Sequence, residues 1–245
     1  MPQKEESLAL KEAREHVFEL KASSLRTREA LIELLPNPLL TYGDAARNNE
    51  AGTLWTWGKS GRPVAFLELY RNIGKDQPWV HALTLTSPEL IQLDAPTGQR
   101  WTPKKSHFVL KDVPDSPEVG VQPVIRLRQM KEISRRFEAH QFWDPDNSRF
   151  EMRLLVQPVH RYHDEASKLI DGAVFVLAHG TNPEVLLQIE AHAGEPSRWR
   201  YSLVRLGSAE MHVLLDGKEV WTEARTPGVV GQPVDPYWLF LTAPK

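Results

Sequence analysis

The sequence of 245 residues contains no cysteine. Disulfide bonds, thiolate metal sites and a cysteine nucleophile are therefore excluded, and the usual indicator of a redox compartment is missing. An excess of charge of one sign is missing too, because 30 lysines and arginines face 32 aspartates and glutamates, for a formal net charge of -2. This balance gives no electrostatic reason to expect a nucleic-acid partner.

Long apolar runs are also absent. The apolar stretches are short and interrupted by polar residues, so we expect no membrane span. Residues 1–11 are polar and lack the apolar core of a signal peptide, which favours a cytoplasmic location for the chain as written. Export would be expected only if a leader had been removed.

The common signatures of catalysis and nucleotide binding do not occur. The sequence has no G-x-S-x-G around a serine nucleophile, no G-x-G-x-x-G and no G-x-x-x-x-G-K-[ST] phosphate-binding loop. Residues 144–148 resemble the start of a calcium loop, but the central glycine and the final glutamate are missing, so a β-turn is the better interpretation. We expect no cofactor.

What the sequence does contain is a similarity to itself at an offset of 120 positions. Between residues 34 and 102, 14 positions carry the same residue as the position 120 further on, without a gap. The matches include Trp79 with Trp199 and Trp101 with Trp221. A period of this length is near the size of a domain, so it predicts a duplicated domain rather than a solenoid.

Each copy is predicted to be an α+β unit, with one helix lying on one face of an antiparallel sheet. Apolar residues recur at three- or four-residue steps in residues 10–17 and 127–137, which is typical of a helix with one buried face. Turn sequences at residues 59–63 and 180–183 separate apolar segments and predict β-hairpins. The expected boundaries are residues 1–110 for the first copy, 111–123 for a linker and 124–245 for the second copy.

Residues found in only one copy are the better functional candidates, because shared residues are explained by the fold. The second copy has His160 and His163 beside Asp164, where the first copy has no histidine. Imidazole and carboxylate groups suggest acid–base catalysis or zinc binding. However, residues three apart on a strand point to opposite faces, and no helical H-E-x-x-H is present. We therefore expect no metal site, and surface or hydrogen-bonding histidines are the alternative interpretation.

Trp55 and Trp57 lie on the same side of one predicted strand and become Phe175 and Leu177 in the second copy. Two interpretations are open. The indole rings are either core residues or an aromatic platform that stacks on a sugar or a peptide.

The second predicted helix is rich in basic residues. A local contact with an anion is one interpretation, but Glu132 and Glu138 interrupt the run, and a solvated helix face explains it better. The basic residues are Arg126, Arg128, Lys131, Arg135 and Arg136.

Several segments together resemble an uncharacterised protein family with many paralogues in planctomycete bacteria. The segments are Gly52-Thr-Leu-Trp-x-Trp with Gly61-Arg-Pro, Arg126-Leu-Arg-Gln-Met-Lys, Gln157-Pro-Val-His-Arg-Tyr, Asp171-Gly-Ala, Gly180-Thr-Asn-Pro-Glu and Asp216-Gly-Lys-Glu-Val-Trp. The resemblance spans about residues 34–241 and implies no activity, cofactor or catalytic residue, because the family has none assigned. Many of its members begin with an export signal, which this sequence lacks.

The leading hypothesis is a non-catalytic ligand-binding or protein-interaction protein. Its ligand, a small molecule, a sugar or a peptide, would lie in a groove between the copies or on the sheet of one copy. The alternative is an unrecognised, hydrolase-like enzyme that uses His160, His163 and Asp164, which predicts that these side chains converge in one pocket. A purely structural role would instead predict an extensive exposed apolar patch.

Overall fold

The computed structural model describes residues 7–27, 31–44, 49–59, 61–72, 77–144 and 146–243. Within these residues the chain forms two helices and three sheets whose strand pairs are all antiparallel. The predicted antiparallel sheets are therefore confirmed. The helices are a minor component, so the fold is richer in strands than the expected α+β mixture.

The first half of the chain, from α1 to β9, builds two sheets. The four-stranded sheet has the order β2-β1-β7-β8, and β3 to β6 belong to a five-stranded sheet. The elements are α1 (Leu8–Phe18), β1 (Lys21–Ser24), β2 (Leu31–Ile32), β3 (Leu40–Asp44), β4 (Asn49–Trp57), β5 (Ala65–Asn72), β6 (Trp79–Leu85), β7 (Ile91–Asp94), β8 (Arg100–Trp101) and β9 (Lys111–Asp112).

The second half, from α2 to β17, builds one larger sheet of eight strands in the order β16-β15-β10-β11-β12-β13-β14-β9. Its helix begins at Pro123, a residue suited to the first turn because it needs no amide partner there. The helix ends at Ser134, so Phe137, which was expected in the helix, opens a strand instead. The elements are α2 (Pro123–Ser134), β10 (Phe137–Trp143), β11 (Ser148–Asp164), β12 (Leu169–His179), β13 (Asn182–His192), β14 (Arg198–Arg205), β15 (Glu210–Leu215), β16 (Lys218–Glu223) and β17 (Tyr237–Thr242).

Each half supplies one strand to the sheet of the other. The last strand, β17, pairs with β6, so that the five-stranded sheet has the order β17-β6-β5-β4-β3. In the other direction β9, which lies within the predicted linker, pairs with β14. Both sheets are thus completed at an edge by a strand from the other half. The boundaries at residues 110 and 124 remain a prediction.

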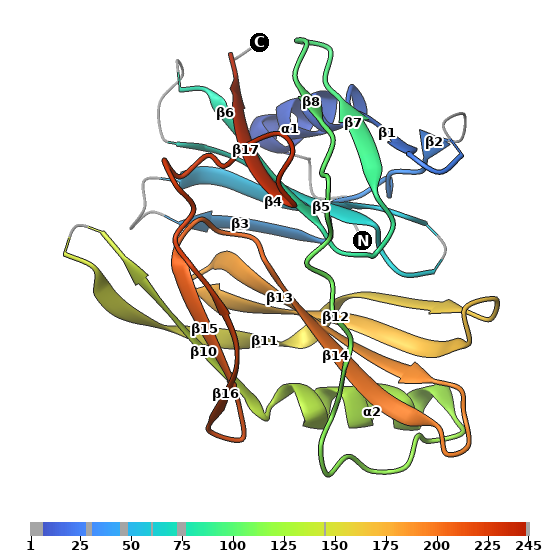
Figure 1. Ribbon diagram of the computed structural model, residues 1–245. Coiled ribbons are helices and arrows are strands. Elements are labelled where there is room, and N and C mark those ends of the chain that lie inside the picture. The colour runs from blue at the N-terminus through green and yellow to red at the C-terminus, as the bar shows by residue number, and fades with distance from the viewer. Residues whose placement is uncertain are drawn as a thin grey trace.

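The five-stranded and eight-stranded sheets pack face to face, and each carries a helix on its outer side (Figure 1). Leu54 and Phe66 of the first sheet meet Val174 and Leu186 of the second in the core between them. On the outer side of the first sheet, α1 and the four-stranded sheet cover a core that includes Trp55. On the outer side of the second sheet, α2 covers another core, to which β10 and β15 of the same sheet also contribute. Both faces of each central strand are therefore buried.

The strand registers of the two halves agree at the same offset of 120 residues. Trp55 lies opposite Leu67 as Phe175 lies opposite Leu187. In the adjacent pair of strands, Tyr42 lies opposite Gly52 as Tyr162 lies opposite Gly172. In both places the phenol ring covers the glycine.

These two glycines are required by a close approach. A Cβ on Gly52 would lie 2.2 Å from Cζ of Tyr42, and one on Gly172 would lie 2.5 Å from Cε2 of Tyr162. The two hydroxyls also have similar roles, because Tyr42 donates a hydrogen bond to Glu68 and Tyr162 donates one of 2.8 Å to Glu190. The two tyrosines are thus hydrogen-bond donors to buried glutamates within the fold.

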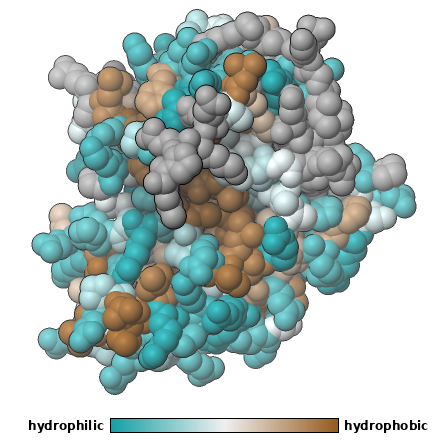
Figure 2. Space-filling model, turned by 180° about the vertical axis from the view of Figure 1, so that it is seen from behind, coloured by the Kyte–Doolittle hydropathy of each residue, from teal (hydrophilic) through white to brown (hydrophobic). Residues whose placement is uncertain are grey.

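The back of the molecule shows apolar surface gathered near the middle of the face (Figure 2). Large exposed apolar side chains occur in both halves, including Phe18 of α1 and Val156 of β11. Neither described helix has the length and hydropathy that a transmembrane helix needs.

Candidate functional site

A pocket of 660 Å³ opens between the two sheets and is lined by both halves of the chain. Its volume falls within the range of about 300–1,000 Å³ that is usual for small-molecule sites. We call it the central pocket. Its lining is formed by Glu68, Tyr70, Asn72, Ala82, Gln141, Trp143, Asp144, Phe150, His179, Gly180, Asn182, Glu184, Gly207, Ser208, Ala209, Val229, Tyr237 and Leu239.

Two buried glutamates, one from each sheet, lie in this pocket. Side chains alternate along β5, so Glu68 points with Phe66 toward the second sheet while Leu67 packs beneath α1. Glu184 is on β13 and points the opposite way, toward the first sheet. Each glutamate is only 3% exposed. Burial of a carboxylate is costly unless hydrogen bonds or charges compensate it, so each needs specific partners.

Hydrogen bonds to both glutamates are present. Glu184 Oε1 accepts a hydrogen bond of 3.0 Å from Asn182 Nδ2 and a longer one of 3.4 Å from Gln141 Nε2. The same Gln141 nitrogen lies 3.1 Å from Nδ1 of His179. Glu68 accepts its hydrogen bond from the hydroxyl of Tyr42. A network of amide, imidazole and phenol groups therefore holds the two carboxylates.

The pKa values of two tyrosines, Tyr42 and Tyr237, are raised by both carboxylates. Burial raises the pKa of Tyr42 well above its usual value, and the negative charges of Glu68 and Glu184 raise it further. Burial likewise raises the pKa of Tyr237, with a contribution from the same two glutamates. Both glutamates thus act on the same two phenols from opposite sheets, and these phenols stay protonated donors at neutral pH.

Aromatic rings form the apolar part of the central pocket. Phe150 lies against the ring of His179, with the centroids 4.6 Å apart. Trp143 is covered on one face by the guanidinium of Arg225, 4.4 Å from the ring centroid. Arg225 also donates hydrogen bonds of 3.0 and 2.5 Å to the two oxygens of Asp144. The charge of Asp144 is therefore compensated by an arginine.

Arg205 fixes the loop that forms one wall of the pocket. It donates hydrogen bonds of 2.8 Å to the carbonyl of Gly207 and 2.9 Å to that of Ala209. A third hydrogen bond, of 2.9 Å, reaches the carbonyl of Ala224. Its guanidinium also lies over the ring of Tyr237, 5.1 Å from the centroid. This buried arginine therefore sets the position of pocket residues from two segments.

The histidines proposed from the sequence lie outside the central pocket and on opposite sides of β11. His160 stacks on Tyr162, with ring centroids 5.9 Å apart, on the side that faces the first sheet. Burial lowers the pKa of His160, and its Nε2 has no hydrogen-bond partner among the described residues. His163 faces the other side, where it lines a second pocket beside α2.

Asp164 lies at the end of β11, where its carboxylate accepts a hydrogen bond of 3.0 Å from the backbone nitrogen of Ala166. That bond is typical of an aspartate that stabilises a turn. Strand geometry thus separates His160 from His163 as their spacing indicated. A catalytic role for His160, His163 and Asp164 remains a prediction. Within the described ranges, no group of three histidine, aspartate or glutamate side chains is arranged to hold a metal ion.

Trp55 and Trp57 are 0% and 1% exposed and belong to the core beneath α1. Trp55 donates a hydrogen bond of 2.9 Å from Nε1 to Thr53 and meets Phe18 of α1 edge to face. Both indole rings are therefore buried core residues in this structure. Their role in ligand binding remains a prediction.

The glutamates of the central pocket were not among the sequence-derived candidates, although a signal for them exists. Glu68 interrupts the apolar run of residues 65–69, and Glu184 directly precedes the apolar run of residues 185–187. A charged residue in a strand that is buried on both faces is unusual and needs a local reason.

Comparison with known proteins finds no matching family model, no matching curated protein and no matching solved structure. The site is therefore interpreted from its own geometry.

Proposed function

We propose that the protein binds a small polyhydroxylated ligand, such as a mono- or disaccharide, in the central pocket. The observation that carries this proposal is the pair of buried glutamates, Glu68 and Glu184, which line one pocket from opposite sheets. Carboxylate oxygens accept hydrogen bonds from sugar hydroxyls, and the amides of Asn72 and Asn182 both donate and accept them. The negative charge of the two glutamates disfavours an anionic ligand.

The aromatic residues support the same ligand class. Trp143, Phe150 and Tyr237 lie in the same lining as the glutamates. The flat face of an aromatic ring packs well on the apolar face of a sugar, while the polar groups fix its orientation. This arrangement corresponds to the expected binding protein with a ligand in a groove between the copies.

We further propose that the two halves arose by duplication of one unit. The identities at an offset of 120 and the equal strand registers support this origin. The exchange of β9 and β17 between the sheets supports it as well, because each strand follows the last strand of its own half. In this proposal, the central pocket is a joint product of both copies.

Ligand binding can be tested with a panel of glucose, galactose, N-acetylglucosamine, cellobiose and maltose by saturation-transfer NMR, followed by calorimetry. We expect at least one sugar to bind at millimolar concentrations. Glu184→Gln and Trp143→Ala should each weaken that binding by about tenfold or more, since each removes a partner within the pocket. Phe18→Ala, an exposed aromatic residue on α1, is the matched control and should bind like the wild type.

Two results would contradict the proposal. One is the absence of a signal from every sugar in the panel. The other is sugar binding that neither Glu184→Gln nor Trp143→Ala weakens, which would place the sugar elsewhere. Thermal unfolding of each variant shows that it is folded before its binding is compared.

A further inference from the structure

A second pocket, of 750 Å³, lies where α2 begins, and it does not share a lining residue with the central pocket. We call it the α2 pocket. It is formed by the start of α2, the end of β11, the β11–β12 turn and the start of β12. Its lining comprises Pro123, Arg126, Arg161, Tyr162, His163, Glu165, Lys168, Leu169, Ile170, Asp171 and Ala193.

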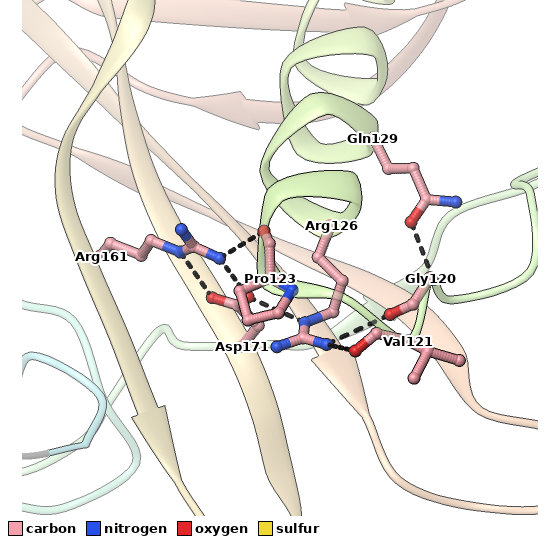
Figure 3. Close-up of polar contacts among 7 residues, drawn as sticks. All are labelled: Gly120, Val121, Pro123, Arg126, Gln129, Arg161 and Asp171. Carbon is pink, nitrogen blue, oxygen red and sulfur yellow. Dashed lines mark hydrogen bonds and ion pairs between the residues drawn. The ribbon is translucent and has the colours of Figure 1, made fainter.

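Two arginines bracket one aspartate in this pocket (Figure 3). Arg126 donates a hydrogen bond of 2.8 Å from Nε to Asp171. Arg161 donates from Nε to one oxygen of Asp171 at 2.9 Å and from Nη2 to the other at 2.5 Å. Further hydrogen bonds join Arg126 to the carbonyls of Gly120 and Val121. These contacts attach the start of α2 to β11 and β12.

The contacts leave an excess of positive charge. The side chains of Arg126 and Asp171 are only 10% and 6% exposed, and Arg161 is 35% exposed. Two guanidinium groups therefore share one buried carboxylate, and one positive charge is not compensated within the trio. The hydrogen bonds and charge of Asp171 raise the pKa of Arg161, so this charge is retained at any ordinary pH.

Each arginine also keeps a donor for a further partner. Nη2 of Arg126 and Nη1 of Arg161 make no hydrogen bond to any described residue, and Nη2 of Arg126 is not fully buried. Lys168 adds a third positive charge to the lining, and Glu165 adds one negative charge. The first turn of α2 contains no acidic residue, so the start of this helix adds no negative charge of its own to the pocket.

Another part of the lining is apolar. Leu169, Ile170, Ala193 and Pro123 line the same pocket as the guanidinium groups. A ligand that fits both parts has a planar oxyanion for the arginines and an apolar body for the aliphatic side chains.

We propose that the α2 pocket binds a small organic carboxylate, held by Arg161, Arg126 and Lys168 through its charge and by the aliphatic residues through its body. Calorimetry on the full chain with sodium benzoate tests this. Benzyl alcohol serves as the uncharged analogue and inorganic phosphate as an oxyanion without an apolar body. We expect saturable benzoate binding that weakens as salt is added, and much weaker binding of the other two.

Variants locate the site. Arg161→Gln should weaken benzoate binding by about tenfold or more, and Lys168→Gln by about three- to tenfold, because charge-assisted contacts are lost. Lys168 is exposed, so its replacement leaves the fold intact even if Arg161→Gln proves unstable. Lys218→Gln, an exposed lysine on the β15–β16 hairpin, and Trp143→Ala in the central pocket should bind benzoate like the wild type.

The proposal is overturned by the absence of benzoate binding, by equal affinity for benzyl alcohol and benzoate, or by benzoate binding that Lys168→Gln does not change. Phosphate that binds as tightly as benzoate would also overturn it, because the site would then be an oxyanion site with no use for its apolar part. The benzoate experiment does not measure sugar binding. Its failure would therefore leave the proposed sugar binding in the central pocket untouched, and the reverse also holds.

Discussion

The interface between the two sheets has two ends that correspond in sequence but differ in structure. At one end, Arg62, Glu190 and His192 fill the space with an ion-pair network. The residues 120 positions away are Asn182, Tyr70 and Asn72, and all three line the central pocket at the other end. Positions that correspond in the two halves thus form a buried ion-pair network at one end of the interface and line the central pocket at the other.

The closed end shows what the open end lacks. Arg62 donates hydrogen bonds of 2.7 Å from Nε and Nη2 to the two oxygens of Glu190, which is 0% exposed. The hydroxyl of Tyr162 and Nε2 of His192 also contact that carboxylate, at 2.8 and 2.7 Å. At the open end no arginine takes the place of Arg62, and a short asparagine stands there instead. Asparagines in place of Arg62 and His192 therefore leave room for a ligand at one end without a change in the strand framework.

The largest expected effect comes from breaking the closed end. Arg62→Ala should lower the free energy of unfolding by about 3–5 kcal/mol, because it leaves Glu190 buried with its charge only partly compensated. Urea denaturation measures this. Lys59→Ala, in the same hairpin, is the control: its ion pair with Glu33 is exposed, with side-chain exposures of 66% and 58%, and its loss should cost less than about 1 kcal/mol. Equal effects of the two variants would contradict the comparison.

The cost of Arg62→Ala should also depend on pH. Burial alone would raise the pKa of Glu190, but the hydrogen bonds from Arg62 and His192 and the charge of Arg62 outweigh it and lower the pKa from 4.5 to about 2. A depressed pKa stabilises the fold above the unfolded value and loses that effect as the pH falls through the folded value. Without Arg62, burial should raise the pKa of Glu190 in the variant. The difference between wild type and Arg62→Ala should therefore begin to shrink above pH 4.5 as the pH falls, and it should be smallest near pH 2. A difference that grows on acidification would contradict this assignment.

An intermediate loss of stability is expected at the tyrosine–glycine contact that both halves contain. Gly52→Ala and Gly172→Ala should each lower the free energy of unfolding by about 1–3 kcal/mol, because the added methyl group overlaps the ring of Tyr42 or Tyr162. In a double-mutant cycle, Gly172→Ala combined with Tyr162→Ala should be less destabilising than the sum of the single changes. A large effect at one glycine and none at the other would show that the two contacts are not equivalent.

The smallest effect concerns the helix starts, which also differ between the halves. Ser7 caps α1 by accepting a hydrogen bond of 3.3 Å from Leu10 N, whereas the side chain of Gln122 makes no such bond at α2. Ser7→Ala should therefore cost about 0.5–1 kcal/mol, and Gln122→Ala almost nothing. Thermal unfolding of both variants checks this, and a larger loss for Gln122→Ala would show a role for that side chain outside capping.

Much of the local structure could be predicted from the sequence. The hairpins around residues 59–63 and 180–183 are confirmed by β4 with β5 and β12 with β13. Glycine, proline and asparagine at turns restrict the backbone locally, so these signals do not depend on distant contacts. The two halves differ near residue 34, because β2 covers only residues 31–32 and Pro36 follows it where the second half has Val156. Proline cannot donate to a sheet, which accounts for the break between β2 and β3.

The candidate site could not be predicted in the same way. The central pocket combines side chains from β5, β10, β13 and β17, and its glutamates are separated by more than 100 residues. Sequence comparison between the copies favoured His160, His163 and Asp164 because they are specific to one half. It gave no weight to Glu68 and Glu184, since their proximity depends on how one sheet covers the other.

Periodicity and backbone restrictions within short segments specify the main hairpins, the turns and the helix at the start of each half, and the 120-residue offset is visible in the amino-acid sequence itself. That the two sheets face each other, that β9 and β17 change sheets, and that one end of the interface is filled while the other is hollow depends on contacts between distant segments. The physical reason is that strands buried on both faces carry apolar residues on both sides. Their pattern therefore does not reveal which face meets a helix and which meets the other sheet.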